Sequence, residues 1–128
     1  MASYLLDTHT ALWYFNGDEK LSKTAHEIIY NSSNAIYLSI TSVWELAIKI
    51  GLGKMKFDGK SAGFIRLAEE DDFTILPIKT AHLDELENLT MIHRDPFDRL
   101  LIATALAEQM ILITTDENIA KYKVSQIW

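Results

Sequence analysis

The sequence predicts a three-layer α/β/α sandwich around a central, mostly parallel sheet of four to five strands. The chain has 128 residues, of which 48% are hydrophobic and 23% charged, and this is the size and composition of one globular domain. Short β-type runs alternate along it with longer segments of helical periodicity. Strands separated by helices form βαβ units, which assemble a parallel sheet covered by helices on both faces. We therefore expect a single domain over residues 1–128.

The first half of the chain is expected to contain two strands and three helices. The strands are residues 4–6 and 35–39, and the helices span residues 8 or 10 to 16, 22–30 and 42–50. Ser22 is a typical N-cap, and Gly17 and Gly51 stand where glycine commonly ends a helix.

The second half continues the same alternation. Helices are expected over residues 61–68, 80–86, 96–109 and 119–122, and strands over 73–78, 111–114 and, at the edge of the sheet, 124–128. Asp95-Pro96 is the strongest helix start, because it joins an N-cap acid to a proline at the first helical position.

Composition excludes several classes of function. A net charge of −6 argues against a surface that is basic throughout and against a polybasic membrane patch. The chain has no cysteine, which excludes a disulfide scaffold, a thiolate zinc site, an iron–sulfur cluster and a cysteine nucleophile. The first basic residue is Lys20, and the longest nearly apolar run, residues 100–107, is far below the ~20 residues that span a bilayer. We expect a cytoplasmic protein without a signal peptide.

Four acidic residues, far apart in the sequence, are predicted at one edge of the sheet. Asp7 and Asp116 follow the first and fourth strands, and Glu45 and Asp98 are placed in the first turns of two helices. Ligands of such sheets bind outside the carboxyl ends of the strands, where these residues would meet. Converging carboxylates need a cation or a proton, and oxygen ligands suit Mg²⁺ or Mn²⁺. One or two such ions in an acidic cup support phosphodiester cleavage.

Each of these acids also has a structural interpretation. Glu45 ends a Ser-x-x-Glu pattern that is typical of a capping box, and Asp95 is expected to be an N-cap. The helix dipole alone favours Asp98, and Asp116 could be a turn residue that opens the last helix. Only Asp7 has little structural use, because a single acid at the end of a buried strand caps nothing obvious. The joint placement of the acids is what favours a metal site.

Basic residues near the predicted cleft also leave two interpretations open. Residues 49–60 contain four lysines and only one acidic residue. This basic strip, which begins at Lys49, would guide a nucleic-acid backbone or form a solvated loop. Arg94 and Arg99 flank Asp98 and would grip a phosphate or neutralise the acids.

Histidines and aromatic residues lie near the same region. His9 and His93 would contact substrate or serve in loops, and zinc is disfavoured because no His-x₃-His pair exists. Three consecutive aromatic residues, Trp13, Tyr14 and Phe15, cannot all point inward from one helix. We expect one or two of them to meet a partner chain or to line a groove.

Four blocks of the sequence carry a family resemblance over essentially the whole chain. They are residues 5–9 (LLDTH), 39–49 (SITSVWELAIK), 93–99 (HRDPFDR) followed by 102–105 (IATA), and 114–116 (TTD). In this order and at these intervals they resemble the PIN domain, and more closely the VapC-type toxins of bacterial toxin–antitoxin pairs. The resemblance implies an Mg²⁺- or Mn²⁺-dependent endoribonuclease that forms homodimers and is neutralised by a cognate antitoxin.

The resemblance also implies site residues. The catalytic and metal-binding positions fall on Asp7, Glu45, Asp98 and Asp116. Asp98 rather than Asp95 matches the third acid, because it precedes the Ala-x-Ala pattern by five positions, although Asp95 could also reach the metal. Thr115 is the usual hydroxyl neighbour of the fourth acid, and Thr8 follows the first.

Two other classes of function are weighed against the nuclease. In an aspartate-nucleophile phosphatase Asp7 would be phosphorylated, but that chemistry needs an acid two residues further on, where His9 stands. A receiver domain would need an acidic pair near the first strand. A non-enzymatic partner-binding module with a relic acidic cleft would keep four repelling acids without using them.

Overall fold

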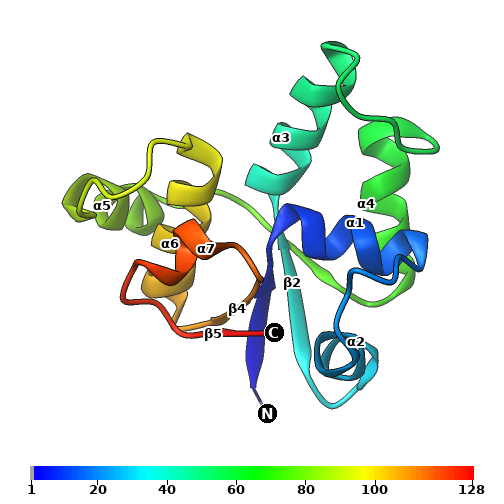
Figure 1. The fold of residues 1–128 in the computed structure, drawn as a ribbon, viewed down its shortest axis with the longest axis horizontal. Helices are drawn as coiled ribbons and strands as arrows, with labels where there is room; N and C mark the ends of the chain where they lie inside the picture. Colours follow the sequence, from blue (N-terminus) through cyan, green and yellow to red (C-terminus); the bar gives the residue numbers. More distant parts are fainter. Residues whose placement is uncertain (1) are drawn as a thin grey trace.

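The fold is a five-stranded, wholly parallel sheet with helices on both faces, as the sequence predicts (Figure 1). It was obtained as a computed structural model that describes residues 2–128. The strands are β1 (Ser3–Leu6), β2 (Ala35–Ser39), β3 (Thr74–Leu76), β4 (Ile111–Ile113) and β5 (Gln126–Ile127), in the order β3-β2-β1-β4-β5. From β1 the chain adds β2 and then β3 on one side. It then crosses back and adds β4 and β5 on the other side of β1, so the strand order reverses at β1. Such a reversal point is where open parallel sheets bind ligands.

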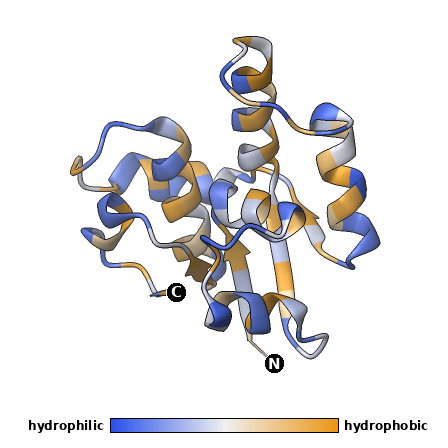
Figure 2. Cartoon of the chain, turned by 45° about the vertical axis from the view of Figure 1, so that its right-hand side comes forward, coloured by the Kyte–Doolittle hydropathy of each residue, from blue (hydrophilic) through white to orange (hydrophobic). Residues whose placement is uncertain are grey.

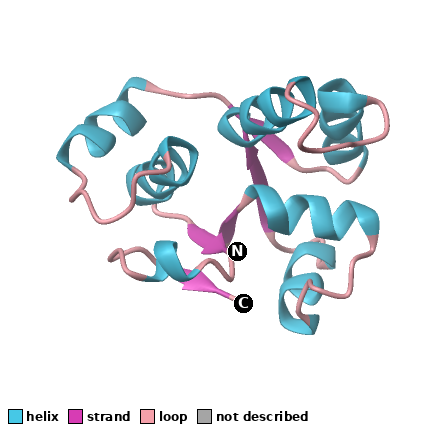
Figure 3. Cartoon of the chain, turned by 45° about the horizontal axis from the view of Figure 1, so that its top comes forward, coloured by secondary structure: helices cyan, strands magenta, loops and turns pink. Residues whose placement is uncertain are grey.

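Seven helices connect the strands among the described residues. They are α1 (Thr8–Asn16), α2 (Lys23–Tyr30), α3 (Ile40–Gly51), α4 (Lys60–Glu70), α5 (Thr80–Asn88), α6 (Pro96–Glu108) and α7 (Glu117–Ala120). Figure 3 shows how the helices surround the short strands of the sheet. Within residues 2–128, no helix has both the length and the apolar character that crossing a bilayer requires.

The core lies in two layers, one on each face of the sheet. Alternation along β1 sends Leu6 into the layer below α1, α2 and α4, and Leu5 into the layer below α6 and α7. Both leucine side chains are completely buried. Hydrophobic residues accordingly occupy the strands and the inward turns of the helices in Figure 2. This packing holds the strand ends, and the residues that follow them, in place.

The start of α3 differs from the prediction. The helix begins at Ile40, and Ser39 is its N-cap, because the Ser39 hydroxyl accepts a hydrogen bond from the Thr41 amide at 3.0 Å. Ser42 is completely buried inside the helix. The capping-box interpretation of Glu45 is therefore wrong, and Glu45 lies in the second turn of α3 rather than in its first.

The three consecutive aromatic residues of α1 have different environments. Phe15 packs against Phe57, Phe64 and Phe73 with ring centroids 5.4–6.4 Å apart, so its ring belongs to the core side of α1. The Tyr14 ring also contacts Phe73. The Trp13 ring contacts the rings of His9 and Trp128, and for Trp13 and Tyr14 the partner surface stays a prediction.

Candidate functional site

The four acids selected from the sequence lie around the point where the order of the strands in the sheet reverses, between β1 and β4. Asp7 directly follows β1, and Asp116 follows β4, which is the neighbour of β1 in the sheet. Glu45 projects from α3 and Asp98 from the first turn of α6. Burial raises the pKa of Asp98 to about 7, and the negative charges of Asp95, Asp7, Asp116 and Glu45 contribute to this rise in that order. The fold thus brings these carboxylates within electrostatic range of one another.

Asp7 is held from the neighbouring strand. Its side chain is only 6% exposed, and its Oδ2 atom accepts a hydrogen bond from the Thr114 hydroxyl at 2.9 Å. Although Asp7 occupies the N-cap position of α1, its side chain caps no amide there. Burial raises the pKa of Asp7, with the charge of Glu45 adding to the rise and the Thr114 hydrogen bond opposing it. Its carboxylate is therefore available for a role other than capping.

Glu45 is buried and has a partner on each carboxylate oxygen. Oε1 accepts from the Thr8 hydroxyl at 2.7 Å, and Oε2 accepts from Lys49 Nζ at 2.7 Å. The Thr8 hydroxyl also lies 2.9 Å from the Ser42 hydroxyl, which ties α1 to α3. Burial alone would lower the pKa of Lys49, but the hydrogen bond to Glu45 and the charges of Glu45, Asp95 and Asp98 raise it. Lys49, expected to guide a nucleic-acid backbone, is thus a direct partner of a site carboxylate.

At the start of α6, two aspartates and a histidine lie together. Asp95 is the N-cap, as predicted, and its Oδ1 atom accepts from the amides of Phe97 at 2.8 Å and Asp98 at 3.2 Å. His93 Nε2 lies 3.2 Å from Asp98 Oδ2. One donor atom from each of His93, Asp95 and Asp98 falls within 4.8 Å of the others, a spacing at which the three residues could hold a metal ion. Sequence reasoning left His93 between a substrate contact and a loop role.

Asp116 and two threonines form the opposite side of the site. Asp116 Oδ1 caps α7 by accepting from the Asn118 amide at 2.8 Å, and the Asp116 amide donates to the Thr114 hydroxyl at 3.1 Å. Thr114 therefore bridges Asp7 and Asp116, whereas Thr115 is exposed. Sequence reasoning selected Thr115 and missed Thr114. Thr114 directly follows a buried strand, and this position was the signal available in the sequence. Side chains alternate along a strand, so Thr114 points inward on the face opposite to that of Ile113.

A hollow of about 230 Å³ opens beside these acids. Its lining residues are Asp7, His9, Trp13, Thr115 and Asp116. Thr115 and His9 thus lie next to the acidic residues, and Trp13 also lines the hollow. Asp7 and Asp116 thus both border a hollow that is open to solvent.

Arg99 has a structural role that the sequence did not indicate. Its guanidinium is buried and donates to the carbonyls of Leu89 at 3.3 Å and Thr90 at 3.0 Å and to the Tyr122 hydroxyl at 3.1 Å. These bonds fasten the loop before α6 to the segment after α7. The expectation that Arg99 grips a phosphate or neutralises the acids is therefore not supported by its contacts. Arg94 is exposed beside the same cluster.

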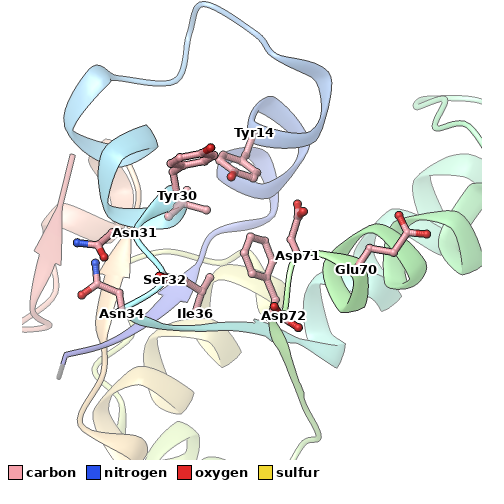
Figure 4. A pocket seen from close by; sticks show the side chains of 11 residues that line it. Tyr14, Tyr30, Asn31, Ser32, Asn34, Ile36, Glu70, Asp71 and Asp72 are labelled. Atoms are coloured by element: carbon pink, nitrogen blue, oxygen red, sulfur yellow. The ribbon is translucent and has the colours of Figure 1, made fainter.

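A larger hollow of about 320 Å³ lies elsewhere on the molecule. Figure 4 shows Tyr14, Tyr30, Asp71 and Asp72 among the side chains that line it. Its residues come from the segments that precede β2 and β3 and from the end of α1, so it belongs to the opposite edge of the sheet. None of the four acids lines it, and its size alone gives it no connection with their chemistry.

The donor set at the carboxyl edge fits a divalent cation. Four carboxylates act on Asp98 there, and Lys49 is bonded to Glu45. Burial and this surplus of negative charge together raise the pKa of Asp98. Carboxylate and hydroxyl oxygens are the ligands that Mg²⁺ and Mn²⁺ prefer. The residues present are thus chemically suited to such an ion.

Comparisons with known proteins agree on the fold. The sequence model of the PIN domain family matches residues 4–124. A search among curated proteins found no match. The chain is similar to the structure of VapBC2 from Rickettsia felis bound to a promoter DNA fragment (17% identity, 98% of each chain covered, TM-score 0.74). It is also similar to DNA-bound VapBC from Salmonella typhimurium (16% identity, 100% of this chain and 98% of that chain, TM-score 0.71) and to a toxin–antitoxin complex from Klebsiella pneumoniae (21% identity, 98% and 96%, TM-score 0.65).

Proposed function

The chain belongs to the PIN domain family, and from this premise we propose that it is a metal-dependent endoribonuclease and the toxin of a toxin–antitoxin pair. The observation that carries the proposal is the charge around Asp98. Burial, together with the charges of four other carboxylates, raises its pKa to about 7, and the nearby lysine is bonded to one of them. Repelling carboxylates destabilise a folded protein, and a bound divalent cation would neutralise them. We therefore interpret the cluster as a site for such an ion.

Each acid has a proposed role. Asp7, Asp98 and Asp116 hold Mg²⁺ or Mn²⁺, and Glu45 holds a second ion or orients the attacking water. A divalent ion bound there supplies an activated water and stabilises charge that develops on the phosphate and the leaving oxygen. Hydrolysis that leaves a 5′-phosphate and a 3′-hydroxyl is what the family resemblance implies.

The surrounding residues orient these acids. Thr114 holds one oxygen of Asp7 at 2.9 Å, which leaves the other oxygen for the ion. Thr8 and Lys49 hold the two oxygens of Glu45, which limits the rotation of that carboxylate. The Lys49 side chain is 30% exposed, and, against the effect of burial, the charges of the nearby acids raise its pKa. It can therefore also contact a phosphate that enters the site. Arg94 and Thr115 are exposed at the rim, where they would contact RNA.

An RNA cleavage assay tests the function. The purified chain is incubated with structured RNA and Mg²⁺, Mn²⁺ or EDTA, beside Asp7→Asn and Asp98→Asn. We expect cleavage that needs the ion and both carboxylates, with rates at least ~100-fold lower in each variant. Glu69→Gln, which changes an exposed acid of α4, is the matched control and should cleave normally. Full cleavage in EDTA would contradict the proposal, and an acylphosphate on Asp7 would support the phosphatase instead.

Partners follow from the same premise. The similar structures are described as VapBC and toxin–antitoxin complexes, and we propose that this chain, as one domain over residues 1–128, forms a homodimer and binds a cognate antitoxin. Co-expression with the product of the reading frame directly upstream should give a stable complex that does not cleave RNA. A chain that binds a partner but never cleaves RNA, alone or with any divalent ion, would be the non-enzymatic module.

A further inference from the structure

His93 lies in the site beside the acidic residues, and the proposed function gives it no role. Its Nε2 atom lies 3.2 Å from Asp98 Oδ2, and with Asp95 the three donor atoms fall within 4.8 Å of one another. The side chains of His93 and Asp98 are 26% and 13% exposed, so an ion can reach them from solvent. The cluster therefore joins an imidazole nitrogen to carboxylate oxygens.

The spacing suits two ligands of one ion. Donor atoms that each lie about 2.1 Å from an ion and form a right angle with it are about 3.0 Å apart. The observed separation of 3.2 Å between His93 and Asp98 is close to this value. The pair could thus receive an ion between its two donor atoms with only a small shift of the side chains.

The position of His93 is set by buried residues behind it. The His93 amide donates to the Tyr122 hydroxyl at 2.8 Å, and that hydroxyl also accepts from Arg99 Nη1 at 3.1 Å. Tyr122 and Arg99 are 6% and 8% exposed, and Arg99 also binds the carbonyl of Thr90. Arg99 directly follows Asp98, so one buried network fixes both the loop that carries His93 and the helix turn that carries Asp98. A preset position of this kind is what metal ligands require.

We propose that His93 is a nitrogen ligand of the divalent ion and that it makes the site favour Mn²⁺ over Mg²⁺. The proposal rests on the proposed function, which places an ion beside Asp98. Imidazole suits transition metals, whereas Mg²⁺ is bound through oxygen and keeps several of its waters. An added nitrogen ligand therefore increases the affinity for Mn²⁺ more than the affinity for Mg²⁺.

A simple ion pair is the alternative explanation of the same geometry. His93 would then only neutralise Asp98, and an incoming ion would displace it. The two explanations agree on distances but differ on whether the imidazole nitrogen is bonded to the metal, which spectroscopy detects directly.

The first experiment is pulsed EPR of the full chain loaded with Mn²⁺. The unaltered chain should show ¹⁴N coupling to the manganese, and His93→Asn should lose it. His9→Asn is the matched control, because His9 lines the hollow on the other side of the site, and it should keep the coupling. Circular dichroism and thermal melting check that both variants fold. Manganese without ¹⁴N coupling in the unaltered chain, or coupling that survives in His93→Asn, would overturn the proposal.

Calorimetric titration with Mn²⁺ and with Mg²⁺ gives a second readout. His93→Asn should lower the ratio of Mn²⁺ to Mg²⁺ affinity on the order of tenfold, and an unchanged ratio counts against ligation. A chain that binds neither ion would overturn both this proposal and the proposed function. A chain that binds Mn²⁺ and cleaves RNA without nitrogen coupling would overturn this proposal alone.

Discussion

The two sides of the acidic site are built differently. Asp7 and Glu45, the buried pair, have partners from distant parts of the chain, since Thr114 binds the first and Thr8 and Lys49 bind the second. Asp95, Asp98 and Asp116, the open group, are more exposed, and the first and last of them each use one oxygen to cap their own helix. Folding thus gives both members of the buried pair hydrogen-bond partners, while in the open group Asp98 is subject to the negative charges of its neighbours.

This difference separates stability from function within one site. Removing a carboxylate from the buried pair breaks bonds that hold α1, α3 and the sheet together. Removing one from the open group relieves repulsion that folding has to overcome. Both changes should damage catalysis, but they should move the free energy of unfolding in opposite directions.

The largest expected effect is on catalysis by the open group. Asp98→Asn should lower RNA cleavage at least ~100-fold, or about 3 kcal/mol in the activation barrier, because it removes a charged metal ligand. In the metal-free state the same variant should unfold at a higher temperature than the unaltered chain, since the repulsion with its neighbours is gone. Parallel cleavage and melting measurements check this. A variant that loses activity and melts lower would contradict the comparison.

Stability should respond most strongly in the buried pair. Glu45→Gln should lower the free energy of unfolding by about 1–3 kcal/mol, because it weakens the bonds to Thr8 and Lys49 in a buried place. Urea denaturation measures the change. Glu69→Gln, on the exposed surface of α4, should alter stability by less than about 0.5 kcal/mol. Equal effects of the two variants would show that Glu45 is not held as its contacts indicate.

A pH titration should show the charge of the open group. The folded pKa of Asp98 is about 7 against an ordinary 3.8, so between these values the folded chain holds a proton that the unfolded chain releases. The stability of the metal-free chain should therefore fall as pH rises from 5 to 7, by about 1–2 kcal/mol given the partial solvent access of the group. Asp98→Asn should flatten this decline. A decline of the same size in that variant would assign it to other groups.

The smallest expected effect distinguishes two adjacent threonines. Thr114→Val should cost about 1 kcal/mol of unfolding free energy and weaken metal binding, because it removes the hydroxyl that bridges Asp7 and Asp116. Thr115→Val changes an exposed neighbour and should cost less than about 0.5 kcal/mol. Denaturation and calorimetry of the pair measure both. A larger effect at Thr115 would restore the sequence-based choice.

Local signals in the sequence were enough for the fold and for the edge at which the acids gather. The alternation of strands and helices predicted a parallel sheet, and a parallel sheet places Asp7 and Asp116 at its carboxyl edge. Asp95-Pro96 predicted the start of α6 correctly, because an N-cap and a proline act within one helical turn. The start of α3 was misplaced because Ser39 and Ser42 are equally good caps in a local pattern.

What the sequence by itself determined is therefore what depends on nearby residues: the class of fold, most helix starts, and the edge to which the acids belong. Tertiary structure decided which side chains hold those acids. Thr114 and Asp7 are 107 positions apart and Glu45 and Thr8 are 37 apart, yet each pair forms a buried hydrogen bond. Tertiary structure likewise directs Arg99 to the loop that carries His93, where it binds a backbone carbonyl, rather than to the acidic site. Such partners are chosen by packing in three dimensions, and no spacing along the chain records that choice.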